Sequence, residues 1–146
     1  MVDDLYQEII LDHSKRPRNH HTMDDANRKA EGYNPLCGDK LKLFLKVDGD
    51  IVRDVSFVGS GCAISTASAS LMTETLKGKS REEALQLLDK FHELLTTDTE
   101  VSKELGKLVV FCGVREYPAR VKCATLAWHT LKSALSGSAA EPVTTE

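Results

Sequence analysis

The chain has 146 residues, of which 41% are hydrophobic and 28% are charged. This length is typical of a single domain that buries roughly 70% of its unfolded surface and needs no disulfide bonds. The formal charge of -3 argues against nucleic acid or an anionic membrane as the main partner. No apolar run reaches the ~18 residues of a membrane span, and the acidic start is unlike a signal peptide. We therefore expect a cytoplasmic protein, in which reduced cysteines serve as metal ligands, reactive thiols or core residues.

The N-terminal segment predicts a helix that begins at Asp3 or Asp4 and ends near Ser14. Apolar side chains repeat in it at helical spacing. We expect them to form a buried stripe made of Leu5, Tyr6, Ile9, Ile10 and His13. Pro17 ends this helix because a proline disfavours the helical conformation of the residue before it.

A β-hairpin follows a weaker strand signal at residues 27–33. Apolar residues alternate with lysines over residues 41–47, and apolar residues alternate again over residues 51–57. A three-residue loop pairs Leu43 with Val55 and keeps the apolar side chains of both strands on one face. Because a slip of one residue would turn one strand over, we expect this register rather than the one set by a two-residue loop.

The remaining elements are predicted to be helical. Small residues form a helix over 63–77 that Gly78 ends, and a capping box of Ser80 and Glu83 begins the next helix. Residues 96–113 are less regular, with a short helix expected near 101–105 and an apolar turn over 108–111. The last helix follows Pro118 and ends near residue 136.

These elements predict an α+β fold. We expect a small antiparallel sheet of about three strands, packed against about five helices, with a metal site at one end. Residues 1–136 form one domain in this prediction. Residues 137–146 lack apolar periodicity and are predicted to be a disordered tail.

Three cysteines and one aspartate predict a shared site. Cys37 and Asp39 flank Gly38 in a turn, and Cys62 and Cys123 each lie near the start of a predicted helix. One such cysteine is more simply explained as a small buried apolar residue, but three that each enter a new element favour a common function. Thiolates and carboxylates are good zinc ligands, and four of them complete a tetrahedron.

Such a site carries a net charge of about -2, because three thiolates and a carboxylate surround one Zn²⁺. Nearby cations are therefore expected, and Arg120 and Lys122 flank the third cysteine closely enough to provide them. The spacing of the cysteines matches no zinc finger or Cys-x-x-Cys motif. The residues alone thus predict a thiolate site for metal or sulfur, without deciding between the two.

Four stretches resemble the U-type iron–sulfur cluster assembly proteins, the IscU/SufU family. They occur in the right order between about residues 4 and 135, and they are Arg16-Pro17-Arg18-Asn19, Asn34-Pro35-Leu36-Cys37-Gly38-Asp39, Gly59-Ser60-Gly61-Cys62-Ala63-Ile64-Ser65 and Lys122-Cys123-Ala124-Thr125-Leu126-Ala127-Trp128. In the IscU-type scaffolds a histidine precedes the third cysteine, and a two-proline chaperone motif lies upstream of it. Lys122 replaces that histidine here, and the stretch 117–121 replaces the motif. Both departures, and the long segment ahead of the last helix, resemble the SufU branch.

The resemblance implies a zinc protein that takes persulfide sulfur from a SufS-type cysteine desulfurase, stimulates its turnover, and passes the sulfur to downstream assembly or acceptor proteins. By motif matching, the zinc ligands are Cys37, Asp39, Cys62 and Cys123. In that branch the partner enzyme displaces the residue that matches Cys37 from the zinc ion, which makes Cys37 the sulfur acceptor. Arg120 resembles a basic residue beside the metal. The chain is in this sense a sulfurtransferase-like acceptor.

Two other functions stay open at this point. One is a scaffold on which a transient [2Fe–2S] cluster assembles on the three cysteines, with Asp39 as the oxygen ligand that makes the cluster labile. The other is a purely structural zinc domain, which we rank lower because a carboxylate ligand and a flexible Gly38 suit exchange. Cys112 departs from the family pattern, and we expect it to be a buried thiol of the 108–111 turn rather than an auxiliary one.

Overall fold

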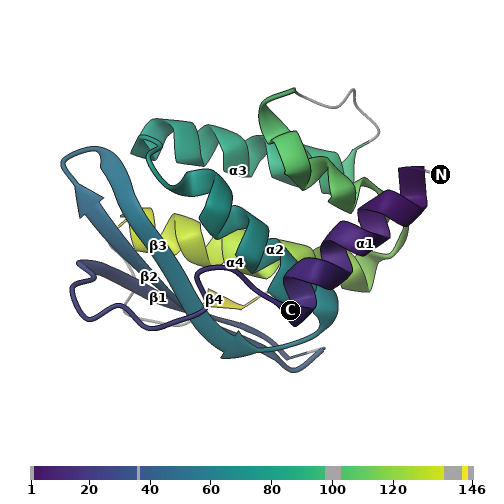
Figure 1. The fold of residues 1–146 in the computed structure, drawn as a ribbon, viewed down its shortest axis with the longest axis horizontal. Coiled ribbons are helices and arrows are strands. Elements are labelled where there is room, and N and C mark those ends of the chain that lie inside the picture. The colour runs from purple at the N-terminus through teal and green to yellow at the C-terminus, as the bar shows by residue number, and fades with distance from the viewer. Residues whose placement is uncertain (1, 36, 98–102, 137–142, 145–146) are drawn as a thin grey trace.

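One antiparallel sheet packs against a layer of helices, as the sequence predicts (Figure 1). The computed structural model describes residues 2–35, 37–97, 103–136 and 143–144. The elements in chain order are α1 (Val2–Lys15), β1 (Arg28–Asn34), β2 (Asp39–Asp48), β3 (Ile51–Ser60), α2 (Ala63–Leu76), α3 (Arg81–Thr96), the 3-10 helix η1 (Lys103–Glu116), α4 (Pro118–Ser136) and β4 (Val143–Thr144). The strand order is β3-β2-β1-β4, and among the described strand pairs β4 with β1 is parallel while the other two are antiparallel.

The hairpin of β2 and β3 forms in a register that the sequence did not predict. Asp48 pairs with Ile51 across a two-residue turn, and Leu43 pairs with Phe57 rather than with Val55. A two-residue turn by itself would place the apolar residues of the two strands on opposite faces. Because the register shifts once near the turn, where Arg53 has no partner, the apolar residues of both strands return to one face. The bulge thus achieves what the predicted longer loop was expected to achieve.

The helix boundaries follow the predicted signals. α2 ends at Leu76 shortly before Gly78, which has a positive φ of 84°. The capping box that begins α3 is present in both directions, since Glu83 N–H donates to Ser80 Oγ and Ser80 N–H donates to Glu83 Oε1. These local signals fix where α2 stops and where α3 starts.

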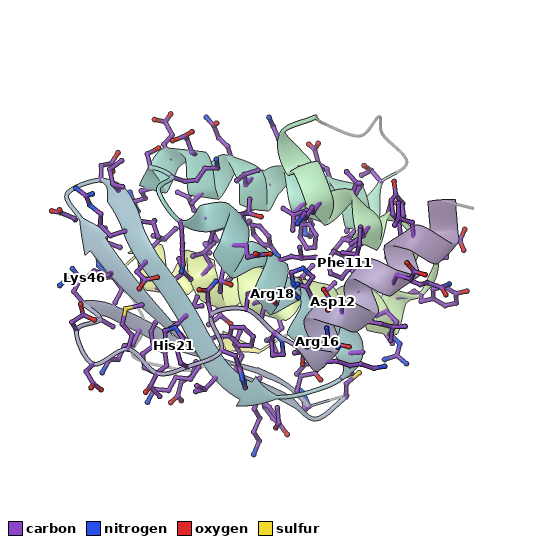
Figure 2. All side chains as sticks on the ribbon, viewed as in Figure 1. Asp12, Arg16, Arg18, His21, Lys46 and Phe111 are labelled. Atoms are coloured by element: carbon purple, nitrogen blue, oxygen red, sulfur yellow. The ribbon has the colours of Figure 1, made fainter. Side chains whose placement is uncertain are left out.

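The first helix buries less than its spacing predicts. Leu5 is 56% exposed, so its assignment to the buried stripe was wrong, whereas His13 is buried. Tyr6, Ile9 and Ile10 pack against the core as predicted, and together with His13 they form the buried side of α1, which contacts α2 and η1. Arg18, just after the helix, binds Asp12 of α1 with an Nη2–Oδ2 distance of 2.7 Å (Figure 2).

The region predicted to be irregular is the 3-10 helix η1. It is interrupted at Gly106, which has a φ of 53°, and it buries Leu108 and Phe111 in the core. The Phe111 ring meets the edge of Phe91, which in turn stacks on Trp128 of α4. The short helix predicted near 101–105 lies in part outside the described residues.

Of the predicted tail, the structure describes only Val143 and Thr144. They pair with Gly32 and Tyr33 of β1. The other residues of 137–146 lie outside the described part of the chain, so the prediction of a disordered tail stays a prediction. Among the described helices, none combines the length and the apolar character that crossing a membrane demands.

Candidate metal and thiol site

The four predicted ligands meet at one end of the sheet. Cys37 lies in the turn between β1 and β2, Asp39 begins β2, Cys62 precedes α2, and Cys123 lies in the second turn of α4. The Sγ atoms of Cys37 and Cys123 are 3.1 Å apart, and Cys62 Sγ lies 4.0 Å from Asp39 Oδ2. The ligand atoms of Cys37, Asp39 and Cys123 all lie within 4.8 Å of one another. The chain thus gathers three thiols and one carboxylate from separate elements.

Asp39 is the most firmly held member of this cluster. Its side chain is fully buried, and its Oδ1 accepts a hydrogen bond from the main-chain N–H of Cys62 at 2.8 Å. A Cβ atom at Gly61 would stand 2.6 Å from the same oxygen, so the chain can pass this close to the carboxylate only with a glycine. Oδ1 is therefore committed to the backbone, and Oδ2 is the oxygen on the side of the thiols.

Asn34 contacts two members of the cluster, although the motif that contains it assigned it no role. Its Nδ2 donates to Asp39 Oδ2 at 3.2 Å and to Cys123 Sγ at 3.5 Å. Its Oδ1 is buried without a hydrogen-bond partner in the described structure. The available signal was its position, because Asn34 falls in register with the inward-facing Ala30 and Gly32 of β1. A polar side chain there needs a buried partner.

The thiols of Cys62 and Cys123 sit in different electrostatic settings. Cys62 is the N-cap of α2, at the positive end of the helix dipole, and its Sγ accepts the main-chain N–H of Ser65 at 3.5 Å. Cys123 is fully buried. Burial, and then hydrogen bonds with Cys37 and Cys62, raise the pKa of the Cys123 thiol far above its usual range. Such a group is neutral unless a cation compensates for its charge.

Of the two predicted cations, Arg120 is the one coupled to the cluster. Charges on Cys62 and then on Cys123 raise the pKa of the Arg120 guanidinium, which lies on α4 one turn before Cys123. Lys122 is half-buried and directly precedes Cys123. The electrostatic role of both residues stays a prediction.

Cys112 does not join the cluster. It is half-buried on η1 and packs against the core, and it lines a separate pocket. The residues of the cluster itself fit a zinc ion, because three sulfur donors and one oxygen donor, from Cys37, Asp39, Cys62 and Cys123, lie close together. The buried Cys123 thiol and the neighbouring carboxylate are groups that a divalent cation would neutralise.

The chain is similar in sequence to a known protein family and to characterised proteins. The model of the family described as "NifU-like N terminal domain" matches residues 5–136. The chain is 45% identical to an iron–sulfur cluster assembly scaffold protein IscU of Streptococcus pyogenes serotype M1, over 94% of this chain and 87% of that protein. It is 43% identical to the zinc-dependent sulfurtransferase SufU of Bacillus subtilis (strain 168), over 92% of each.

Solved structures share the fold as well. A crystal structure from Fervidobacterium islandicum AW-1, described as a proposed scaffold protein for the SUF system of iron–sulfur cluster assembly, matches with a TM-score of 0.83. It is 40% identical, and the match covers 88% of this chain and 94% of that one. The two sequence relatives are nearly equally similar to this chain but carry different functional names. The names alone therefore do not decide between a scaffold and a sulfurtransferase.

Proposed function

Because this chain belongs to the family of NifU-like N-terminal domains, we propose that it serves iron–sulfur cluster assembly as a zinc-binding acceptor of persulfide sulfur. The donor in this proposal is a SufS-type cysteine desulfurase. The observation that carries the proposal is the unequal anchoring of the four donors. Asp39 and Cys123 are fully buried, whereas Cys37 is half-buried on a turn.

The departures from the scaffold pattern support this choice. Lys122 precedes Cys123 where the scaffold branch is expected to carry a histidine. A histidine can ligate a metal or an iron–sulfur cluster at neutral pH, but a lysine ammonium has no free lone pair. Lys122 instead brings a positive charge next to Cys123 in the sequence, which would suit an anionic zinc site.

Cys37, Asp39, Cys62 and Cys123 would hold the zinc ion, which would keep the thiols deprotonated at neutral pH. Asn34 orients Asp39 through its Nδ2, and Gly61 leaves room for the carboxylate. The protein thereby fixes three donors from β2, α2 and α4.

The transfer step belongs to Cys37. Its thiolate attacks the outer sulfur of the donor's persulfide, and a new S–S bond forms at Cys37 as the donor's S–S bond breaks. The donor's cysteine leaves as a thiolate. One S–S bond is made and one is broken, so the step needs no oxidant or reductant. Arg120, which is coupled to the neighbouring thiolates, would stabilise the negative charge.

The test is a desulfurase assay with purified partners. L-cysteine and a SufS-type enzyme are incubated with the wild-type chain, with Cys37→Ser, or with Cys112→Ser as the matched control. We expect the wild type and Cys112→Ser to raise the rate of alanine formation and to gain the mass of one sulfur atom. Cys37→Ser should do neither. No rate increase and no mass gain with the wild type would rule out the proposal.

The scaffold function is a second candidate, favoured by the name of the Streptococcus relative and by the oxygen ligand Asp39. The variant Asp39→Ala separates the two. In a scaffold it should slow the loss of a reconstituted [2Fe–2S] cluster, because an exchangeable oxygen ligand is removed. In a zinc acceptor it should instead weaken zinc binding. Visible absorption of the cluster and a zinc competition assay measure the two outcomes.

A further inference from the structure

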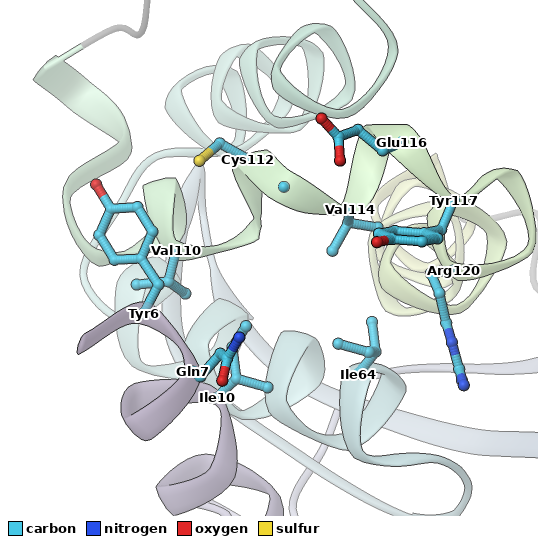
Figure 3. A pocket seen from close by; sticks show the side chains of 11 residues that line it. Tyr6, Gln7, Ile10, Ile64, Val110, Cys112, Val114, Glu116, Tyr117 and Arg120 are labelled. Atoms are coloured by element: carbon cyan, nitrogen blue, oxygen red, sulfur yellow. The ribbon is translucent and has the colours of Figure 1, made fainter. Parts of the chain in front are cut away.

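A pocket of about 400 Å³ lies beside the thiol cluster and is not used by the function proposed above. Figure 3 shows it between Tyr6 and Ile10 of α1, Ile64 at the start of α2, and Tyr117 just ahead of α4. Tyr117 is 61% exposed, and the neighbouring Gly113 of η1 is also exposed. The pocket therefore opens to solvent.

The pocket is continuous with the rim of the thiol cluster. Ile64 comes two residues after Cys62, and Arg120 comes three residues before Cys123 on the same helix. Arg120 belongs to both places, since it lines the pocket while the charges on Cys62 and Cys123 act on its guanidinium. Any protein that brings a persulfide to Cys37 comes close to this pocket.

The chemistry of the walls favours a large apolar side chain as the occupant. Ile10, Ile64, Val110 and Val114 form apolar walls. Small-molecule sites place a few polar groups around an enclosed ligand, but no polar side chain that lines this pocket is buried. An apolar centre with tyrosine and arginine at its rim is the composition of a protein–protein anchor site.

The described tail of the chain lies away from the pocket. α4 starts beside the pocket and runs for 19 residues to Ser136, which takes the chain about 28 Å away. The next described residues, Val143 and Thr144, pair with the sheet at β1. A partner protein is therefore the better candidate for the occupant.

Resting on the proposed function, we infer that this pocket receives an apolar anchor side chain of the sulfur donor when the donor covers Cys37. The anchor sets the affinity of the complex and the approach to Cys37. It takes no part in the sulfur transfer or in zinc binding. The pocket should therefore affect how much protein is needed, rather than how fast the saturated enzyme works.

Gly113 offers a direct way to fill the pocket. It lines the pocket, an added Cβ would meet no atom within 4 Å, and its backbone is not left-handed. Gly113→Trp should therefore fold and place its side chain at the pocket, while Gly113→Ala adds only one methyl group and serves as the control. Circular dichroism and zinc content check that both variants keep the fold and the site.

Two quantities are measured with the desulfurase of the assay above. They are the dissociation constant from a direct titration and the concentration that gives half-maximal stimulation. For Gly113→Trp we expect both to rise roughly 10- to 30-fold, the size of a hot-spot loss, with unchanged maximal stimulation. Gly113→Ala should stay within about two-fold of the wild type. Equal affinity of Gly113→Trp and wild type would overturn the inference.

A second measurement does not depend on the tryptophan variant. Cys112 lines the pocket, so its alkylation by N-ethylmaleimide, followed on its own peptide, reports whether the pocket is covered. With N-ethylmaleimide in large excess over all thiols, saturating desulfurase should slow this alkylation several-fold, and an equal concentration of an unrelated protein without free thiols should not. Unchanged alkylation with the desulfurase, or equal protection by the unrelated protein, would overturn the inference.

The two proposals can fail separately. If the wild type binds the desulfurase and Gly113→Trp binds weakly, the pocket inference holds even where no persulfide forms on Cys37. If persulfide forms and Gly113→Trp binds as the wild type does, the proposed function holds and the pocket inference fails. Absence of any binding by the wild type overturns both.

Discussion

The backbone around Cys37 is less constrained than the backbone around Cys62 and Cys123. Cys37 lies in a turn, whereas Cys62 directly precedes α2 and Cys123 lies within α4. Gly38, beside Cys37, has a φ of 71° and open space around its Cβ position. Cys123 is fully buried among the residues of α4, and Cys62 caps α2. The turn can change shape without breaking a helix, whereas the helical cysteines cannot move alone. The site thus combines three anchored ligands, Asp39, Cys62 and Cys123, with Cys37 on a more adaptable turn.

The largest effects are expected from replacing one cysteine in each of the two regions. Cys37→Ser should abolish persulfide formation on the chain, because the proposed nucleophile is gone. Measured without metal, its melting temperature should stay close to that of the wild type. Cys123→Ser should lower the free energy of unfolding by about 1–3 kcal/mol, because it replaces a buried thiol with a more polar hydroxyl. Thermal unfolding and intact-mass measurement check both.

The contrast between the two serine variants is the control. If Cys37→Ser destabilised the metal-free protein as much as Cys123→Ser, Cys37 would be as firmly anchored in the fold as Cys123. A persulfide on another cysteine of Cys37→Ser would also contradict the division.

A second variant removes a side chain that holds two of the anchored ligands in place. Asn34→Ala removes the amide that binds both Asp39 and Cys123. We expect zinc affinity to fall by about 10- to 100-fold, as for other residues that orient metal ligands. Competition with a chromophoric chelator measures the affinity. Tyr33→Ala, at the neighbouring outward-facing position, is the control, and an equal loss there would contradict a specific role of Asn34.

A third variant crowds Asp39, one of the anchored ligands. Gly61→Ala would place a methyl group 2.6 Å from Asp39 Oδ1. We expect a loss of about 1–3 kcal/mol in stability from overpacking, which lowers the melting temperature by roughly 2–4 °C per kcal/mol. Gly113→Ala, with no atom within 4 Å of the added group, should leave the melting temperature unchanged. Equal melting temperatures for the two variants would show that Asp39 yields.

The smallest effect concerns how α1 is fastened to α2. His13 is buried, and its Nδ1 lies 2.7 Å from Ser70 Oγ. Burial, and then the charge of Arg18, hold the pKa of His13 below 6.5. Below that pH the unfolded chain binds more protons than the folded one, so stability is lost as the pH falls. The slope should not exceed about 1.4 kcal/mol per pH unit, and His13→Gln should reduce it. A slope unchanged in His13→Gln would assign it to other groups.

Local signals made much of the fold predictable. The capping box at Ser80, the stop at Gly78 and the alternating strands each depend on neighbours in sequence, and the structure contains all three. The bulge at Arg53 was not predictable, because alternation fixes the face of a strand but not where one extra residue enters. The exposure of Leu5 depends on how far α1 overlaps α2, which no spacing reports.

The site divides in the same way. The ligand types and their entry into separate elements were visible in the sequence, and the structure gathers Cys37, Asp39 and Cys123 as expected. The role of Asn34 and the closeness of Gly61 to Asp39 depend on distances between segments. Such contacts arise only when β1, β2 and the start of α2 have packed together.

Cys62 has a consequence for how the site could be observed. The same Sγ that is offered to the cluster also accepts the amide N–H of Ser65 and caps α2. A thiolate caps a helix better than a neutral thiol does, because a charged acceptor strengthens the hydrogen bond. The Ser65 amide should therefore exchange its hydrogen with solvent more slowly whenever Cys62 is deprotonated. A single backbone amide would then report the charge state of the thiol cluster, in a part of the chain that takes no part in sulfur transfer.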